Sequence, residues 1–299
     1  QQPVSSFTSS APKLSDALEK YCRLKGTDRA EQFFKAAKRN VGYVIQHLGD
    51  RPLDVYSSSD AASFRDWLVK KHLSSSSIKR IFSTIRAVFT LTIQEEGLKC
   101  SNAFAKTFLP SEERPKRASI SPEDIKRVQK ICLEVGDERR LLVALISDTG
   151  MRLSEALGLV WDDIILDHKY PHINLIPHPW RPLKTVGSKR CIPLVGAAHE
   201  AIKIMHRQRT TSFLFNSYTD ETGCKGNSCS AALNKWLKQH VPDAVIHSFR
   251  HSFRDRLRNA GVQSEMIDQL GGWSNQSVGQ GYGDGYALSA LTNYMTPIF

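Results

Sequence analysis

Hydrophobic residues recur every three or four positions through the N-terminal third of the chain, which is the spacing of one buried face of an α-helix. Four stretches show the pattern: Leu14 to Tyr21, Val41 to Leu48, Phe64 to Leu68, and Ile78 to Phe89. They predict an all-helical N-terminal unit that ends near Phe104. The preceding residues, 1–12, are rich in Ser, Gln and Pro and predict a disordered lead-in.

A segment without periodicity follows this unit. Residues 110–117 read PSEERPKR, a charged stretch punctuated by proline, which is typical of an exposed linker. Helical spacing resumes after it, where Ser121 can cap a helix whose first residue is Pro122. The sequence therefore predicts a first domain at 13–109 and a second domain at 118–299.

The second domain combines helical patterns with two short extended segments. Helices are predicted at Pro122 to Val135, Arg139 to Asp148, Ser154 to Leu159, Ala197 to Arg207, Ser230 to His240, Ser248 to Ala260, and Ser264 to Leu270. The strands HINLIP, from His172, and RCIPLV, from Arg190, flank a turn-rich segment. These patterns indicate a mixed α+β domain that is mainly helical.

Composition narrows the class of partner. The chain has 299 residues, which fits two packed domains better than one large domain. Hydrophobic residues make up 40% and charged residues 24%, as in ordinary globular proteins. Lys and Arg number 41 against 30 Asp and Glu, and the net charge of +11 favours a polyanionic partner, because binding phosphates releases counterions. A protein that is merely basic is the alternative.

Basic and hydroxyl groups on the exposed faces of the N-terminal unit are candidate contacts to a phosphate backbone. Ser74 to Ser77 offer hydroxyls and a helix N-terminus, which suits an anion. A solvated surface is the alternative for each charged residue. The candidates for binding DNA are Lys35, Lys38, Arg39, Ser76, Lys79 and Arg80.

Several other classes of protein are disfavoured. The longest apolar run, Leu141 to Ile146, is far too short to span a bilayer, so no membrane partner is expected. The six cysteines have no CxxC pair, which fits a reducing cytoplasm, and no metal or other cofactor is expected. His247 and His251 lack the glutamate of a zinc-protease motif. The chain begins without Met, so a longer product is expected.

Two arginines in the second domain form a candidate phosphate clamp. Arg152 follows Gly150 in DTGMRLSEALGL, where one helix ends and the next begins, and Arg250 lies in HSFRHSF. An arginine fork recognises phosphate oxygens bidentately, so two of them around one phosphate would hold it firmly. Metal-free phosphoryl transfer also needs a nucleophile and a proton donor for the leaving oxygen.

These segments together resemble the tyrosine recombinase (phage integrase) family. TGMRLSEAL is similar to the first arginine box, KTVGSKRCIPL to the lysine hairpin, and HSFRHSF to the H-x-x-R-H box. In LGGWSNQSVGQGY, Trp273 and Tyr282 stand nine positions apart, and His247 precedes Trp273 by 26, as in the family. The resemblance implies an all-α, SAM-like core-DNA-binding domain followed by a mainly helical catalytic domain with a small antiparallel sheet.

The resemblance also implies the chemistry of the site. Tyr282 would attack the scissile phosphate and form a 3′-phosphotyrosyl bond, which a 5′ hydroxyl can later reverse without ATP or another cofactor. Arg152 and Arg250 would bind the phosphate and lower the pKa of the phenol. Tyr286 and Tyr294 are the rival nucleophiles.

The remaining roles follow the same boxes. Lys184 would protonate the leaving 5′ oxygen, with Lys189 as the competitor, and His247 would orient or deprotonate the nucleophile. His251 is expected to be a structural histidine packed against its helix. Glu155, three residues after Arg152, would support an active-site side chain. Trp273 departs from the common histidine; its indole N–H can donate one hydrogen bond to phosphate, or the ring can buttress Tyr282.

The expected partners are double-stranded DNA at specific recombination sites and further copies of the chain. The resemblance implies a homotetramer on DNA, a monomer free in solution, and a cytoplasmic enzyme associated with the nucleoid. The segment from Ala287 to Met295 would pack on a neighbouring protomer or on its own domain. A type IB topoisomerase and a catalytically silent DNA-binding regulator are the alternative functions, and an upstream arm-site-binding domain is possible.

Overall fold

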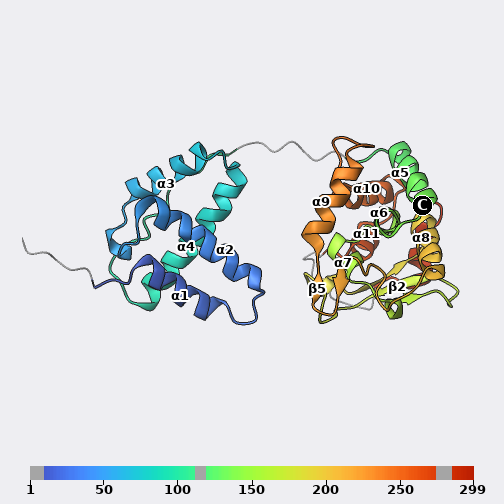
Figure 1. Ribbon diagram of the computed structural model, residues 1–299, viewed down its shortest axis with the longest axis horizontal. Helices are drawn as coiled ribbons and strands as arrows, with labels where there is room; N and C mark the ends of the chain where they lie inside the picture. Colours follow the sequence, from blue (N-terminus) through green and yellow to red (C-terminus); the bar gives the residue numbers. More distant parts are fainter. Residues whose placement is uncertain (1–9, 112–118, 274–284) are drawn as a thin grey trace, which may run out of the picture. The chain divides into compact units, whose positions relative to one another are not determined.

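The computed structural model describes residues 10–111, 119–273 and 285–299 (Figure 1). The chain divides into two compact units, Gln1–Pro115 and Lys116–Phe299. This division falls inside the predicted linker at 110–117, of which residues 112–117 lie outside the described residues. Each unit has its own hydrophobic core.

The N-terminal unit is helical where the hydrophobic spacing predicts it. Its helices are α1 (Leu14–Lys25), α2 (Glu31–Leu48), α3 (Ser58–Lys70) and α4 (Ser75–Glu95), with a 3₁₀ turn η1 (Leu53–Val55). Helix α2 begins ten residues before Val41, the first position of the predicted pattern. Its first turns pack on α1, where Phe33 stacks on Tyr21 at 5.6 Å between ring centroids. Figure 1 shows α1, α2 and α4 packed beside one another.

Aromatic side chains fill the core of this unit. Phe64, Phe82, Phe89 and Phe104 are fully buried. Phe89 and Phe104 pack with their ring centroids 4.9 Å apart, so Phe104, beyond the last helix, closes the core at the expected place.

The predicted disordered lead-in, residues 1–12, wrongly includes its last residues. Residues 1–9 lie outside the described residues, but Ala11 is buried and the Pro12 carbonyl accepts a hydrogen bond of 3.1 Å from the Leu53 amide. Lys13 pairs with Pro52 as a short antiparallel bridge. These contacts hold residues 11–13 against the η1 turn, a long-range pairing that composition does not reveal.

The C-terminal unit is mainly helical with two small antiparallel sheets. Its helices are α5 (Pro122–Val135), α6 (Glu138–Thr149), α7 (Leu153–Leu157), α8 (Gly196–Arg207), α9 (Gly226–Leu237), α10 (Ile246–Asn259), α11 (Ser264–Gly271) and α12 (Leu288–Met295). Each predicted helix is present, with ends that differ by a few residues. Helix α5 has the predicted cap, in which Ser121 Oγ accepts from the Asp124 amide at 3.1 Å.

Helix α6 is the centre of this unit. Every residue from Leu141 to Thr149 is buried, and the helix contacts α5, α8 and α10 on its different sides. This explains the apolar run in the sequence, since a helix surrounded by others is hydrophobic all round. None of the helices among the described residues is long and apolar enough to cross a membrane.

The larger sheet has the order β1-β2-β3 and is antiparallel throughout, with β1 at Ile164–Ile165, β2 at His172–Leu175 and β3 at Arg190–Pro193. The predicted strands correspond to β2 and β3 and are shorter than expected, and His172 pairs with Pro193. The smaller sheet pairs β4 (Thr219–Asp220) with β5 (Gly223–Cys224), which no alternation in the sequence indicates because each strand has two residues. Two further 3₁₀ turns are η2 (Trp161–Asp163) and η3 (Val186–Ser188).

The C-terminal segment packs on its own unit. Leu291 and Met295 of α12 are buried in a cluster with Val195, Phe253 and Leu257. Phe299 stacks on Phe253 at 5.2 Å between ring centroids. Of the two predicted arrangements of this segment, the described residues of the single chain therefore show packing against the same domain.

Candidate active site

The first arginine is held at a tight junction between two helices. Helix α6 ends at Thr149 and is followed by its C-cap residue Gly150, whose φ of +60° lies in the left-handed region. A Cβ at Gly150 would lie 2.5 Å from the Phe253 ring. Arg152 lies at a helix start, as predicted; it is the N-cap residue of α7, and its amide donates to Glu155 Oε2 at 3.0 Å. The turn therefore fixes where the Arg152 side chain begins.

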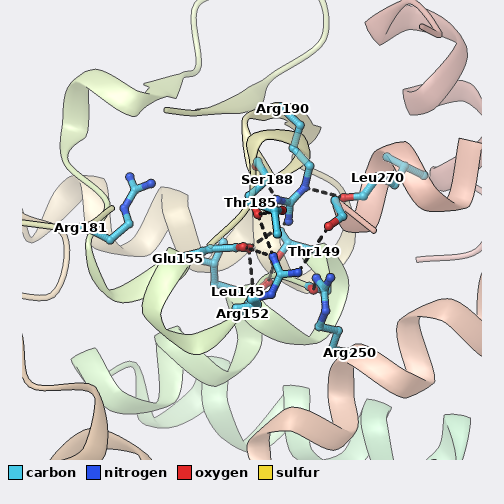
Figure 2. Close-up of polar contacts among 12 residues, drawn as sticks. Leu145, Thr149, Arg152, Glu155, Arg181, Thr185, Ser188, Arg190, Arg250 and Leu270 are labelled. Carbon is cyan, nitrogen blue, oxygen red and sulfur yellow. Dashed lines mark hydrogen bonds and ion pairs between the residues drawn. The ribbon is translucent and has the colours of Figure 1, made fainter. Parts of the chain in front are cut away.

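Glu155 holds two guanidinium groups at once. The carboxylate is almost completely buried, pairs with Arg152 Nη1, and accepts from Arg190 Nη2 at 3.1 Å (Figure 2). Burial opposes ionisation of Glu155, but Arg190 and Arg152 outweigh it and hold the pKa of the carboxyl below its ordinary value. Glu155 is therefore an ionised counter-charge that fixes both arginines.

Arg190 is a site residue that the sequence patterns did not single out. It lies on β3, is buried, and donates from Nε to the Leu270 carbonyl at 2.8 Å and from Nη1 to the Ser188 carbonyl at 2.7 Å. Burial lowers the pKa of Arg190, and Glu155 opposes that effect. The sequence did contain an indication of this role. Arg190 and Ile192 alternate along β3 and therefore point to the same, buried face, where a charged side chain needs a partner of opposite charge.

Arg250 carries the clearest unused hydrogen-bonding capacity. Its side chain is buried on α10 and donates from Nη1 to the Gly150 carbonyl at 2.5 Å. Its Nη2 atom is buried and makes no hydrogen bond with the described residues. Burial, together with repulsion from Arg152 and Arg190, lowers the pKa of Arg250 to about 9. Figure 2 shows the guanidinium groups of these three arginines converging.

Trp273 closes one side of this group. The guanidinium carbon of Arg250 lies 4.2 Å from the centre of a Trp273 ring, and that of Arg254 lies 4.7 Å from it. The Trp273 amide donates to the Asp268 carbonyl at 2.9 Å, so the residue continues the end of α11. A Cβ on Gly271 would lie 1.7 Å from the indole, so only glycine there leaves room for the ring.

The two histidines of the second box lie together on the surface. His247 and His251 are both exposed, and their rings meet edge-on with centroids 5.2 Å apart. The expectation that His251 packs against its helix is wrong. Helix α10 buries the face that carries Phe249, Phe253 and Leu257, and positions 247 and 251 lie on the opposite face, one turn apart.

The lysine candidates are exposed beside η3. Neither Lys184 nor Lys189 makes a hydrogen bond or ion pair with the described residues, whereas Ser188 between them accepts from Arg152 Nη1 at 3.1 Å. The choice of Lys184 over Lys189 stays a prediction. This hydrogen bond nonetheless ties the lysine loop directly to the first arginine.

The predicted nucleophile, Tyr282, lies outside the described residues, and so do residues 274–284 around it. Of its rivals, Tyr286 donates its hydroxyl to Gln263 Oε1 at 2.6 Å and is held through its backbone by Gln269. Tyr294 lies exposed on α12. The assignment of the nucleophile therefore stays a prediction.

The arrangement suits one kind of ligand. Arg152, Arg190 and Arg250 converge, and among the described residues Glu155 is the one carboxylate that pairs with any of them. Residues 10–111, 119–273 and 285–299 hold no cluster of three or more His, Cys, Asp or Glu side chains suited to a metal ion. An excess of fixed positive charge around a buried donor favours an anion with several oxygens, such as a phosphodiester.

Comparison with known proteins shows which family this chain resembles in sequence. Residues 119–287 match the model of the phage integrase family. The tyrosine recombinase XerC of Rhodospirillum centenum is 25% identical over 86% of this chain and 77% of its own length. The transposase from transposon Tn916 of Enterococcus faecalis is 23% identical over 76% of this chain, which covers 63% of that transposase.

Solved structures share the fold. The integrase of transposon Tn1549, solved with circular intermediate DNA, superposes with a TM-score of 0.71 at 20% identity over 95% of each chain. A lambda integrase tetramer bound to a Holliday junction superposes with a TM-score of 0.69 at 14% identity, covering 96% of this chain and 79% of that one.

The fold and the arginine cluster thus define a phosphoryl-transfer protein of the tyrosine recombinase type. The family match covers more than half of the chain, and the chain belongs to the phage integrase family. It is a site-specific tyrosine recombinase, an enzyme that breaks and rejoins DNA strands.

Proposed function

We propose that this protein integrates or excises a mobile element by cutting and rejoining DNA through a 3′-phosphotyrosyl bond to Tyr282. The observation that carries the proposal is Arg250, whose buried Nη2 has no hydrogen-bond partner among the described residues although Arg152 lies beside it. A buried donor without a partner is unfavourable until an acceptor binds. A non-bridging oxygen of the scissile phosphate is that acceptor.

The charge of the site supports the transition state of this reaction. When an oxygen attacks a phosphodiester, negative charge increases on the equatorial oxygens of the five-coordinate phosphorus. The three converging guanidinium groups exceed the charge of Glu155, and hydrogen bonds fix Arg152 and Arg190 before substrate binds. Such fixed cations stabilise the transition state without reorganising, and in many enzymes this electrostatic stabilisation provides most of the rate enhancement.

Cleavage would proceed in one displacement. The Tyr282 hydroxyl oxygen attacks phosphorus and its proton passes to His247, while the bond between phosphorus and the 5′ oxygen breaks and that oxygen takes a proton from the Lys184 ammonium. Rejoining is the reverse: a 5′ hydroxyl attacks the phosphotyrosine and Tyr282 recovers its proton. The phosphotyrosyl bond keeps the energy of the cut strand, so neither ATP nor another cofactor is required.

The N-terminal unit would serve as the core-DNA-binding domain. Arg39 and Arg80 line one surface hollow of this unit together with Ser77. Asn40 of α2 donates to Thr84 Oγ1 of α4 at 2.9 Å, which sets the spacing of the two helices that carry these arginines. Lys35, Lys38, Ser76 and Lys79 would extend this surface, although Lys35 pairs with Glu31 at 2.9 Å.

The proposed assembly is a homotetramer on two specific DNA sites, formed from monomers that are separate in solution. One solved relative is a lambda integrase tetramer bound to a Holliday junction, and the Tn916 relative is a transposase. Exchange between two duplexes needs four strand cuts, and one nucleophile per chain then requires four chains. An enzyme with this substrate would act at the nucleoid.

A covalent trapping experiment tests the proposal. The wild-type protein and the Tyr282→Phe variant are incubated with a nicked duplex from the ends of the source element, and SDS-resistant, protease-sensitive complexes are measured. Tyr286→Phe and Tyr294→Phe are the matched controls. We expect an adduct from the wild type and both controls, and none from Tyr282→Phe.

Other results would favour a different function or a different nucleophile. Binding without an adduct from any protein would favour a silent DNA-binding regulator. An adduct that forms on duplexes of any sequence, together with relaxation of supercoiled DNA, would favour a topoisomerase. Loss of the adduct in Tyr286→Phe or Tyr294→Phe alone would move the nucleophile to that residue.

A further inference from the structure

The loop between β2 and β3, residues 176–189, touches both ends of the short helix α7. At the N-terminal end of α7, Ser188 Oγ accepts a hydrogen bond of 3.1 Å from Arg152 Nη1, and Thr185 Oγ1 lies 2.9 Å from the same serine oxygen. The end of the loop nearer β3 is thereby fixed to the first arginine.

The other end of the loop crosses the C-terminal end of α7. Trp180 Nε1 donates to the Gly158 carbonyl at 3.1 Å, and Gly158 is the C-cap residue of α7. The side chain of Arg181 passes over the same glycine, where an added Cβ would lie 2.4 Å from Arg181 Cγ. The absence of a side chain at Gly158 therefore leaves room for the Arg181 side chain.

Arg181 ends in a buried ion pair. Its Nη2 donates to Asp163 Oδ2 at 3.3 Å, its Nη1 donates to the Ile176 carbonyl at 2.6 Å, and only 2% of either residue is exposed. His178 Nε2 lies 2.9 Å from Asp163 Oδ1, and its ring stacks on Trp180 at 4.6 Å between centroids. These contacts fasten the loop to η2, in which Asp163 also accepts from the Val160 amide.

A buried ion pair is weak evidence for a purely stabilising role. Burial of two charges costs about as much as their attraction returns, and well-packed apolar residues stabilise as well or better. In some proteins a buried pair instead fixes one particular geometry, because each charge must meet its partner. In Figure 2, Arg181 lies apart from the converging arginines, on the Glu155 side, so it does not bind the phosphate itself.

Lys184 lies between the two fastened points, and its side chain is exposed without a hydrogen bond or ion pair to the described residues. We propose that Asp163 and Arg181 are positioning residues for Lys184: their buried pair, with Ser188 at the other end of the loop, sets Lys184 relative to Arg152. The inference rests on the proposed role of Lys184 as the proton donor to the leaving 5′ oxygen.

The proton transfer supplies a specific test. Replacing the bridging 5′ oxygen of the scissile phosphate by sulfur makes the leaving group a thiolate. Thiols ionise near a pKa of about 8.5, far below alcohols, so the bond between phosphorus and sulfur breaks without a proton donor. A variant that only misplaces Lys184 should be slow on the phosphodiester and normal on the phosphorothioate. A variant with a damaged phosphate site or fold should be slow on both.

The experiment compares rates of covalent adduct formation on the two nicked duplexes. The variants are Asp163→Asn and Arg181→Met, and the control is Asp162→Asn, the same change at the exposed neighbour in η2. Trp180→Phe removes the hydrogen bond to Gly158 and leaves the ion pair, which covers the case that the buried variants do not fold. Lys184→Ala is the reference, and all rates are measured well below each melting temperature.

We expect Lys184→Ala to slow phosphodiester cleavage by about a hundredfold or more, and Asp163→Asn and Arg181→Met by about tenfold to a hundredfold. Trp180→Phe should show a smaller loss. All four should come within about threefold of the wild type on the phosphorothioate, and Asp162→Asn should match the wild type on both substrates.

Three results would overturn the inference. Equal losses on both substrates for Asp163→Asn, Arg181→Met and Trp180→Phe, with Lys184→Ala rescued, would assign the pair a structural role and leave the proposed function intact. Wild-type rates in these variants on both substrates would remove any role. If sulfur does not rescue Lys184→Ala, the proton-donor role of Lys184 fails, and the positioning role fails with it.

Discussion

The guanidinium of Arg250 lies on the face of Trp273, with 4.2 Å between the guanidinium carbon and the ring centre. The negative face of an indole attracts a cation, by about 2 kcal/mol where both are desolvated. Arg250 is buried and repelled by Arg152 and Arg190, so this contact is one of the few that favour its charge. Trp273 thus supports Arg250 at the position where the resemblance leads one to expect histidine.

Two substitutions of Trp273 separate its possible roles. We expect Trp273→Phe to keep most of the cleavage rate, within about fivefold, because phenylalanine still offers a ring face to Arg250. Trp273→Ala should lose about tenfold to a hundredfold, because Arg250 and Arg254 lose the ring. Adduct formation on nicked DNA measures both. Equal, large losses in the two variants would instead assign the function to the indole N–H.

Gly271→Ala should damage the site without unfolding the protein. The added Cβ would lie 1.7 Å from the Trp273 ring, so the indole must move away from Arg250. Gly271 is the last residue of α11, and alanine has a higher helix propensity than glycine. We expect a loss of cleavage similar to that of Trp273→Ala, with a melting temperature close to the wild type. The control is Gly226→Ala, where nothing lies near the added carbon; a normal cleavage rate in Gly271→Ala contradicts the placement of Trp273.

Glu155→Gln should destabilise the protein in a pH-dependent manner. Removing this charge leaves Arg190 buried without its counter-ion, which costs on the order of 3 kcal/mol at neutral pH. The pKa of Glu155 is lowered from an ordinary value of 4.5, so its contribution is complete above that pH and is lost as pH falls through the folded-state pKa. In urea unfolding at pH 7, 5 and 3.5, the difference from wild type should therefore be constant and then shrink. A difference that grows at pH 3.5 would refute this.

Inorganic phosphate should stabilise the protein through Arg250. A bound anion favours the protonated guanidinium, whose pKa is lowered to about 9 in the free protein, so the stabilisation is greatest below pH 9 and declines above it. We expect phosphate, compared with sodium chloride at equal ionic strength, to raise the wild-type melting temperature at pH 7.5 and to raise it less at pH 10.

The matched variants assign this effect to one side chain. Arg250→Gln should lose most of the increase at pH 7.5, whereas Arg258→Gln, on the exposed face of the same helix, should keep it. An increase that is equal in the wild type and Arg250→Gln would show that phosphate binds elsewhere.

Local patterns determined a large part of this protein in advance. The structure contains a helix wherever the three-and-four spacing predicted one, because a helix with one buried face requires that period wherever it packs. Capping residues fixed the start of α5 at Pro122, and Gly150 fixed the turn before Arg152. The arginine boxes and the family they resemble were therefore visible without coordinates.

The tertiary structure decided the environment of those residues. Burial and pairing of charges depend on partners far away in the chain, so periodicity could not show that Arg190 of β3 meets Glu155 of α7, or that Arg181 meets Asp163. The exposure of His251 and the packing of α12 on its own unit have the same origin. The sequence predicted the groups that would bind phosphate; long-range packing decided which of them lose water, and hence which are held in place without DNA.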